Sequence, residues 1–550
     1  MAIPGRPPGE SRPTRSRAQG LSMAQLWTFL GVALPMLAAL LVPMPSVDLA
    51  YQLRAGAGIL AGNGIPTTDA WTSTIFGTPW LDQQWGAQVL LAAVYQAAGW
   101  TGLALLRAGL VGLTFWLVMA TLRSMGAAAR PAALLVLGAF VVAAPALALR
   151  PQLFAIVLFV AALWILADRA SHPRRLLLMP FIAIAWANLH GSFPLIVVVL
   201  GLGWADELGR VLVARAAIRP GHGPGRATAA IRGSTGIALL AAISALATLI
   251  SPFGIDGWRY VEHLAADPSV TSAVSEWRPP TPLEPTGAIF YVSLVIGLGV
   301  AVLRVRADHN RIRPATLAPI ATLLAFGLLG VVTARGLAWW ALVLPISGSA
   351  LAHDGSLTRF LPRRLDAVRT LLAGTSAAST LRSARRSPLN TIIALLLVLV
   401  GVALLPAVRP LGPAGVPVGT LSFAPQGIAA ALRSIAGSNT RPGNLFAWVP
   451  QTWGSWLEFA APDVRYAVDS RIELFPPDVW TDAATISTAS DQWQAALNRR
   501  VVTIVVVAAD EPQLESGLSA WPAWERFYQD SDGSIWIRTT PFAELDGAKP

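Results

Sequence analysis

The sequence contains no cysteine, only one lysine and little charge of either sign. The absence of cysteine excludes disulfides, thiolate metal sites and cysteine nucleophiles. Charged residues make up 13% of the 550 residues and hydrophobic residues 54%, whereas a soluble protein carries roughly 25% charged residues. A soluble enzyme and a disordered chain are therefore both excluded, because each needs far more charge or polarity.

Several catalytic and nucleotide-binding motifs are missing as well. The sequence has no GxxxxGK[ST] phosphate-binding loop, no HExxH zinc pair and no convincing Gly-x-Ser-x-Gly nucleophile turn. ATP-driven transport and zinc-dependent hydrolysis are therefore poorly supported.

Long apolar runs are present instead. Runs of about 18 residues, the length needed to cross a hydrocarbon core, recur along the first 410 positions. The fold class predicted from them is a polytopic α-helical membrane protein with about eleven transmembrane helices in a domain over residues 26–409. The predicted spans are 26–44, 102–122, 131–149, 152–167, 176–190, 192–209, 236–252, 285–303, 314–333, 337–352 and 391–408. Residues 1–25, with four Arg among Pro, Gly and Ser, are interpreted as a disordered cytoplasmic tail.

The distribution of charge predicts the orientation. Residues 1–409 carry 32 Arg and 15 acidic residues, a net charge of +17, whereas residues 410–550 carry 9 basic and 15 acidic residues, a net charge of −6. The basic excess therefore lies in the membrane part, where it reports topology rather than nucleic-acid binding. Placing the arginine-rich connections in the cytoplasm gives eleven crossings and puts the C-terminal domain outside. The apolar segment 86–99 would reverse this alternation, so it is expected to dip into the membrane or to lie at its outer interface; a twelfth span paired with a missed one is the alternative.

Ionisable groups near the spans gather in the connections predicted to be outside, chiefly the loops 45–85 and 253–284. Asp48 directly follows the first span, in a Trp-rich loop that also holds Arg54 and Asp69. A carboxylate beside a membrane boundary is costly unless it is hydrated, paired or used. Asp48 is either a general base at the mouth of a cavity or a helix cap in an ordinary interfacial loop whose Trp residues form an aromatic belt.

Two arginines occupy short turns between apolar runs. Arg150 lies in PALALRPQLF with no acid nearby in the sequence, and Arg335 lies in TARGLAWW. Such a guanidinium either binds a phosphate or snorkels to the lipid headgroups. The acidic, Pro-rich loop 253–284, which contains Glu276, is expected to be mainly solvated.

The segment WANLHGSF places His190 inside an otherwise apolar stretch. Polar groups within a membrane bundle are by default functional or hydrogen-bonded to one another. Gly191 could break a helix here and leave free backbone N–H groups for an anion. A purely structural helix-breaking turn is the alternative.

The C-terminal part is predicted to be a soluble α/β domain over residues 425–550, after a Pro- and Gly-rich linker at 410–424. Strands are predicted near 445–449, 464–468, 501–508 and 534–538, and helices near 425–437, 488–498 and 511–519. Its polar cluster, Asp469 to Arg471 with Glu473, either binds substrate or caps the membrane cavity. Because no nucleophile–base pair is evident, the domain is interpreted as accessory.

A first span that ends at an Asp, followed by a long Trp-bearing outer loop, resembles the GT-C superfamily of membrane glycosyltransferases, such as protein mannosyltransferases and lipid A aminoarabinose transferases. A narrower resemblance is to a group of uncharacterised bacterial membrane proteins. It rests on D-x₅-R-x-G (Asp48, Arg54, Gly56), Pro66 with Asp69, Arg150–Pro151–Gln152, Trp186 to Phe193, Trp453–Gly454 with Leu457, and Asp469–Ser470–Arg471. The last element has Ser470 where that group has Gly.

The resemblance implies a GT-C fold and transfer of a sugar, with inversion, from a polyprenyl-phosphate donor that enters from the lipid. The first-loop acid, matched by Asp48, assists attack by an acceptor hydroxyl or phosphate, and basic groups hold the leaving phosphate. We therefore predict Asp48 as the catalytic residue, and as substrate- or phosphate-binding residues Arg54, Asp69, Arg150, His190 and Arg335.

The expected partners are the lipid bilayer, the polyprenyl-phosphate sugar and an unknown acceptor, without nucleic acid. The predicted location is the bacterial plasma membrane, with the N-terminus in the cytoplasm. The sequence shows no required cofactor and leaves room for a divalent metal. A transporter or flippase of lipid-linked or small polar substrates, and a non-catalytic envelope assembly protein, are the alternatives.

Overall fold

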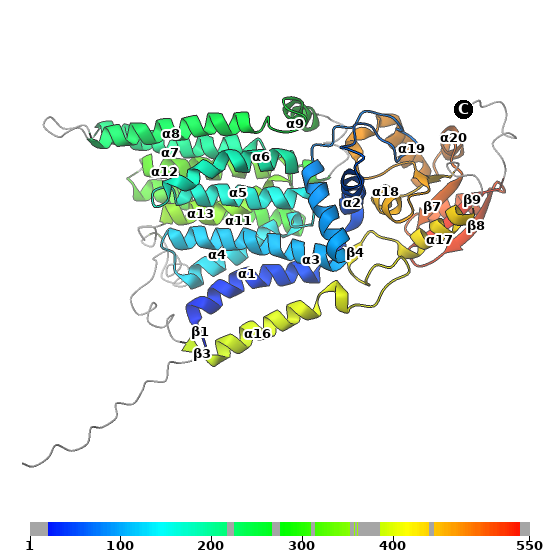
Figure 1. Ribbon diagram of the computed structural model, residues 1–550, viewed down its shortest axis with the longest axis horizontal. Coiled ribbons are helices and arrows are strands. Elements are labelled where there is room, and N and C mark those ends of the chain that lie inside the picture. Colours follow the sequence, from blue (N-terminus) through cyan, green and yellow to red (C-terminus); the bar gives the residue numbers. More distant parts are fainter. Residues whose placement is uncertain are drawn as a thin grey trace, which may run out of the picture.

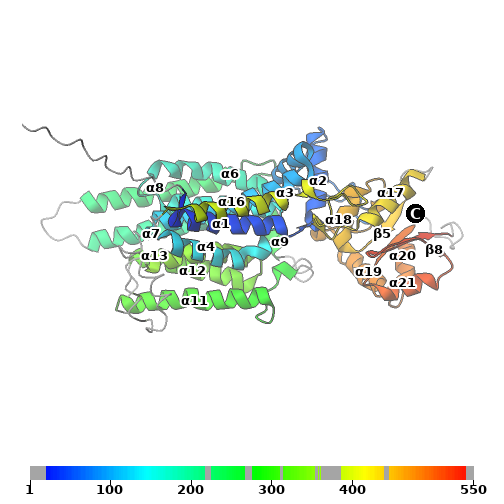
Figure 2. The same cartoon turned by 90° about the horizontal axis from the view of Figure 1, so that it is seen from below.

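The computed structural model describes residues 20–216, 225–266, 275–309, 314–352, 357, 360, 386–438 and 445–539. A bundle of apolar helices occupies one end of the elongated molecule, and the C-terminal region (residues 426–539) occupies the other (Figures 1 and 2). The end of the bundle beside the C-terminal region is called the proximal end, and the opposite end the distal end.

The helices of the bundle follow the apolar runs of the sequence. They are α1 (Met23–Leu41), the second part of α3 (Trp85–Ser124), α4 (Ala129–Ala143), α5 (Pro151–Ala167), α6 (Met179–Leu189), α7 (Leu195–Ala216), α8 (Gly225–Ala247), α11 (Pro285–Ala307), α12 (Pro314–Val332), α13 (Gly336–Ala352) and α16 (Pro388–Ala403). Four of these helices start at a proline, which is tolerated at the first helical position because its missing N–H would have no partner there. Each predicted run coincides with one of these helices.

The length and apolarity of the helices agree with a multi-pass membrane protein. Within the described residues, four helices of at least 18 residues are apolar enough to cross a membrane: α1, α3, α4 and α11. Five further apolar helices, of 10 to 17 residues, lie within α5, α8, α12, α13 and α16. The figure of eleven crossings stays a prediction.

The segment 86–99 forms the first part of α3 and lies across the proximal end of the bundle, beside α2 (Ser46–Leu60) (Figures 1 and 2). The two parts of α3 meet at Gly99, where φ is +56° and ψ is −150°. Such a backbone conformation is open to glycine and strained for other residues. Gly99 therefore redirects the chain from the end of the bundle into it.

The C-terminal region contains a five-stranded sheet with the order β6-β5-β7-β9-β8. Its strands are β5 (Phe446–Trp448), β6 (Arg465–Tyr466), β7 (Ile504–Ala508), β8 (Trp524–Gln529) and β9 (Gly533–Arg538). β5 pairs with β6 and β7 in parallel, and β9 pairs with β7 and β8 antiparallel. The helices are α17 (Gln426–Ser438), α18 (Gln451–Ala460), α19 (Pro477–Ser487), α20 (Trp493–Arg499) and α21 (Pro512–Ser519).

Two features of this region differ from the sequence prediction. The edge strand β8 and the helices α18 and α19 were not predicted; β8 has mostly exposed side chains, so it lacks the buried apolar pattern of β7. The expected linker at 410–424 is also fastened to the bundle. Its strand β4 (Leu421–Ser422) pairs with β2 (Met44–Pro45), and the Met44 amide donates to the Thr420 carbonyl at 2.8 Å.

Candidate active site

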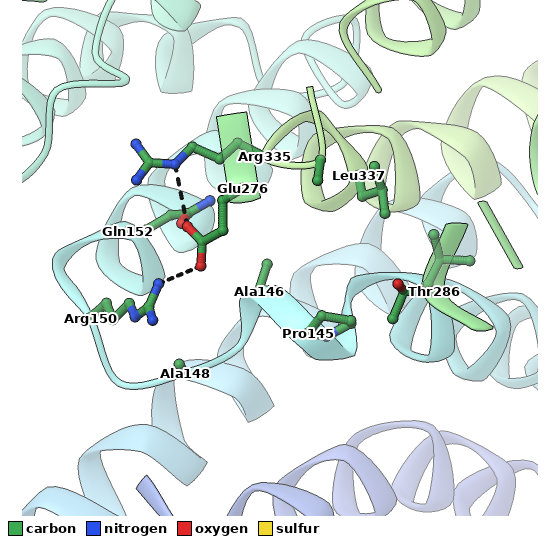
Figure 3. A pocket seen from close by; sticks show the side chains of 11 residues that line it. Pro145, Ala146, Ala148, Arg150, Gln152, Glu276, Thr286, Arg335 and Leu337 are labelled. Atoms are coloured by element: carbon green, nitrogen blue, oxygen red, sulfur yellow. Dashed lines mark hydrogen bonds and ion pairs between the residues drawn. The ribbon is translucent and has the colours of Figure 1, made fainter. Parts of the chain in front are cut away.

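Four charged side chains from separate parts of the sequence meet at the proximal end of the bundle. Arg150 Nε lies 2.9 Å from Asp48 Oδ2, and Arg150 Nη1 donates to Glu276 Oε1 at 2.7 Å. Arg335 Nε donates to the other oxygen of Glu276 at 3.3 Å. Figure 3 shows Arg150 and Arg335 on either side of Glu276. These four residues, alternately negative and positive, are called the charge chain.

Helix starts position the first two members of the charge chain. Asp48 lies in the first turn of α2, where the helix dipole favours a negative charge. Arg150 is the N-cap of α5, with φ −132° and ψ 163°. The following Pro151 favours this extended conformation and starts the helix directly after it.

Backbone hydrogen bonds position the other two members. The short helix η3 (Ser275–Trp277) is fastened to the turn before α13, because the Arg335 amide donates to the Glu276 carbonyl at 3.0 Å and Thr333 Oγ1 donates to the same oxygen at 2.9 Å. The Arg335 guanidinium also lies 4.6 Å from the ring centre of Trp277. The expectation that Glu276 belongs to a merely solvated loop is wrong, since the residue connects two arginines.

Arg150 has no acid nearby in the sequence but gains two acidic partners in the fold. Its side chain is 27% exposed and lies between two carboxylates. The Asp48 carboxylate is the main cause that raises the pKa of Arg150 above its ordinary value, and burial opposes it. Burial alone would raise the pKa of Glu276, but Arg150 and Arg335 outweigh it and lower that pKa. The pairing of Arg150 with Glu276 thus favours the charged form of both side chains.

The contact between Arg150 and Asp48 is an ion pair without a well-formed hydrogen bond. The Nε atom is buried and has no acceptor in hydrogen-bonding geometry, although Asp48 is close. A buried N–H that lacks an aligned acceptor is energetically unfavourable. Arg150 thus keeps capacity for a better placed anion.

A cavity of about 100 Å³ adjoins the charge chain. Arg150, Glu276 and Arg335 line one side of it, as Figure 3 shows. The remaining lining is largely apolar and comprises Val142, Pro145, Ala146, Ala148, Gln152, Thr286, Ala334 and Leu337. The cavity therefore joins a charged wall to an apolar one.

His190 lies at the same end of the bundle but outside the charge chain. It directly follows α6 in an extended conformation, with φ −163° and ψ 141°. The amides of the following turn have local partners: the Ser192 amide donates to His190 Nδ1 at 3.1 Å, and the Phe193 amide donates to the His190 carbonyl at 3.2 Å. The Ser192 and Phe193 amides are thus engaged within the turn, and the anion site expected there stays a prediction.

Arg54 and Asp69 lie in a different cluster, between the first loop and the C-terminal region. Asp69 Oδ1 accepts a hydrogen bond from Arg471 Nη2 at 2.6 Å, and both side chains are fully buried. Arg471 also pairs with Asp469. The Arg54 guanidinium lies 4.9 Å from the ring centre of Trp71, over which Arg471 lies as well, at 4.7 Å. This docking cluster holds the loop against the C-terminal region; Asp69 and Arg471 are fully buried in it and Arg54 is half-buried.

Two glycines of the sequence motifs allow close packing. A Cβ on Gly56 would lie 2.0 Å from the Gln88 carbonyl oxygen, and one on Gly454 would lie 2.0 Å from the Val468 carbonyl oxygen. Ser470, which replaces a glycine of the resembling group, has room for its side chain and hydrogen bonds to Ser455 at 2.7 Å.

A further polar group was not predicted as part of the site. Tyr260, on α9 (Asp256–Ala266), donates to Glu473 Oε1 of the C-terminal region at 3.2 Å. Only the spatial proximity of α9 to the C-terminal region brings this pair together, so no local sequence signal could have identified it.

No cluster of three or more His, Cys, Asp or Glu side chains suited to a metal occurs in the described ranges. In the charge chain the guanidinium of Arg150 supplies the positive charge between Asp48 and Glu276. These residues therefore do not form a metal site as they stand.

The apolar helical bundle, the long first loop and the C-terminal region packed against that loop together resemble the fold of an archaeal oligosaccharyltransferase, and the predicted resemblance is confirmed at the level of the fold. The oligosaccharyltransferase of Archaeoglobus fulgidus in its apo form matches with a TM-score of 0.50 and 12% identity, over 94% of this chain and 74% of that one. The same archaeal enzyme, AglB, in complex with an inhibitory peptide and a dolichol-phosphate, matches with a TM-score of 0.52 and 12% identity, over 95% and 75%. No protein-family model and no curated protein matches the sequence.

Proposed function

We propose that this protein is a membrane glycosyltransferase that moves a sugar from a polyprenyl-phosphate donor to an acceptor outside the cytoplasm. The observation that carries the proposal is the charge chain at the edge of a partly apolar cavity, on a GT-C fold. An archaeal enzyme of the same fold has been solved with a dolichol-phosphate, which supports a lipid-phosphate donor here.

The donor binds with its phosphate between Arg150 and Arg335. Both guanidiniums line the cavity and are paired with Glu276, which a phosphate can displace, because the planar guanidinium fork matches phosphate oxygens. The first isoprene units lie against the apolar wall around Pro145 and Leu337. Arg54 and Asp69 belong to the docking cluster and are assigned no part in this phosphate site.

Asp48 activates the acceptor. The acceptor oxygen attacks the anomeric carbon as the bond between that carbon and the phosphate oxygen breaks, with inversion, and the acceptor proton passes to the Asp48 carboxylate. Arg150 and Arg335 stabilise the negative charge that develops on the leaving phosphate. The C-terminal region lies beyond the proximal end of the bundle, so the acceptor, which is a cell-envelope glycan, lipid or protein, approaches from that side.

The location follows from the arginine pattern. We place the protein in the bacterial plasma membrane with the distal end of the bundle and the N-terminus in the cytoplasm, because the arginine-rich connections stay there. A reporter that is active only in the cytoplasm, fused after Pro550, should be silent. A signal from that fusion would contradict the orientation.

The test of the activity is reconstitution of the full-length protein with polyprenyl-phosphate sugars and envelope acceptor fractions, followed by mass spectrometry. A glycosyltransferase releases polyprenyl phosphate and adds a sugar mass to the acceptor. A flippase leaves the donor intact and only changes its leaflet, whereas an assembly protein does neither. An intact donor in the presence of every envelope fraction would refute the proposed activity.

A further inference from the structure

A chain of hydrogen bonds at the α6–α7 turn fixes the ring of His190. Trp186 Nε1 donates to Ser192 Oγ at 3.0 Å. Ser192 Oγ lies 2.8 Å from His190 Nδ1, and the Ser192 amide donates to the same Nδ1 at 3.1 Å. Trp186 is completely buried, so this network is part of the packed bundle.

The directions of these bonds determine where the imidazole carries its hydrogen. An indole N–H and a backbone N–H can only donate. Ser192 Oγ therefore accepts from Trp186 and has its own hydrogen available for His190, while Nδ1 accepts from the Ser192 amide. An Nδ1 that accepts hydrogen bonds carries no hydrogen, so the ring hydrogen lies on Nε2.

The surroundings also keep the ring neutral. Burial, and then the positive charge of Arg335, lower the pKa of His190 to about 3. Arg335 belongs to the charge chain, and it is the charged group of the described residues that acts on this ring. The first loop contributes the neutral Gln83, which lies against Gly191. Nε2 makes no hydrogen bond to any described residue, so its hydrogen is available to a ligand. The ring centres of Trp186 on α6 and Trp339 on α13 lie 6.2 Å apart, which brings the α6–α7 turn close to the start of α13, where Arg335 lies.

We propose that His190 donates a hydrogen bond, as a neutral imidazole and through Nε2, to the phosphate of the donor, and that Ser192 is the positioning residue that fixes this tautomer. The inference rests on the proposed function for the identity of the ligand. It assigns His190 no proton transfer. Because an Nε2–H donor does not depend on ring protonation, its contribution persists across the range of about pH 5 to 8 in which an ordinary histidine loses its charge.

The tautomer is tested without any substrate. In full-length protein labelled with ¹⁵N-histidine, the His190 signals, identified by their loss in His190→Gln, should show a hydrogen on Nε2 and none on Nδ1, unchanged between about pH 5 and 8. Ser192→Ala keeps the backbone amide donor to Nδ1 but removes the hydroxyl, so it should admit a fraction of the other tautomer. Ser192→Thr, which keeps the hydroxyl, should restore the wild-type pattern. A doubly protonated ring, or a hydrogen on Nδ1, would overturn the inference.

The phosphate contact is tested by binding of a short-chain polyprenyl phosphate. His190→Phe keeps a ring without a donor and should weaken binding about 10- to 100-fold, the worth of one hydrogen bond to a charged group. His190→Gln, whose amide can donate, should retain most of the affinity. His172, 54% exposed and close to Asp168 in the connection between α5 and α6, supplies the control, since His172→Phe should bind like the wild type.

The outcomes separate this inference from the proposed function. Equal binding by the wild type and His190→Phe would refute the contact and leave the function standing. A wild type that binds no polyprenyl phosphate, yet shows the predicted tautomer, would refute the phosphate contact together with the proposed donor. Weaker binding confined to His190→Phe, together with a shift of the Nε2 signal on lipid addition, would support the inference.

Discussion

Replacing Arg150 by lysine tests the donor site most directly. The substitution keeps the positive charge but replaces a planar fork by a single nitrogen. In the structure Arg150 reaches two carboxylates through two different nitrogens, Nε toward Asp48 and Nη1 toward Glu276. One lysine nitrogen cannot occupy both positions, and it cannot present two parallel donors to a phosphate.

The magnitude follows from the loss of at least one hydrogen bond between charged groups. Such a bond contributes about 1.5–3 kcal/mol, so affinity for polyprenyl phosphate should fall about 10- to 150-fold. Arg150 is 27% exposed, and solvent screening of this partly open site favours the lower part of that range. Arg150→Ala should lose more, because it removes the charge as well.

Equilibrium binding of a short-chain polyprenyl phosphate to the purified full-length protein measures the effect. Arg259→Lys is the matched control: this arginine lies on α9, is 67% exposed and pairs with Asp256. It should bind the lipid as the wild type does. Unchanged affinity in both Arg150→Lys and Arg150→Ala would show that Arg150 only neutralises its neighbouring carboxylates, and the donor site would have to be placed elsewhere.

Three further predictions concern carboxylates of the first loop. Asp48→Asn should reduce sugar transfer, measured by product mass, by about 10²–10⁴-fold, the usual contribution of a general base. Asp256→Asn, at an exposed position, should keep wild-type turnover, and full activity of Asp48→Asn would remove Asp48 from the mechanism. Asp69→Asn should lower the free energy of unfolding by about 1.5–3 kcal/mol, since Arg471 keeps Asp469 but loses a fully buried partner, and an unchanged denaturation midpoint would contradict the docking role. Burial raises the pKa of Asp82 from 3.8 to about 7, so between these values the folded protein retains a proton that the unfolded chain releases. The stability contributed by Asp82 is therefore full below about pH 4 and is lost as pH rises toward 7. Asp82→Asn should remove this part of the pH dependence of the melting temperature.

The sequence predicted the bundle well because the property that defines its helices is local. An apolar run of sufficient length must form its backbone hydrogen bonds within itself when it lies in lipid, so each run indicates a helix without reference to its neighbours. The segment 86–99 needed a second argument, from charge alternation, and it lies across the end of the bundle because Gly99 turns the chain. The helices α18 and α19 lacked such a signal, since their packing against the loop and the sheet, rather than their own pattern, stabilises them.

The site was predictable only in part, and for a physical reason. The cost of placing charge beside a membrane singled out Asp48, Arg150 and Arg335, all of which belong to the charge chain. The same reasoning could not identify their partner Glu276, which is 126 residues from Arg150 in the sequence. It also could not separate Asp48 from Asp69, because both lie in one loop and only the fold brings one to Arg150 and the other to Arg471.

In the proposed mechanism, the balance of charge in the charge chain connects donor binding to catalysis. Two carboxylates and two guanidiniums leave the resting site without net charge, and Asp48 lies against Arg150. An arriving phosphate adds negative charge and draws Arg150 and Arg335 toward itself, so Asp48 loses part of the cation that stabilised it. Transfer of the acceptor proton to Asp48 then becomes more favourable, since a carboxylate near added negative charge binds a proton more readily. On this reasoning the donor itself prepares the base, and an acceptor that arrives first meets a carboxylate still engaged by Arg150.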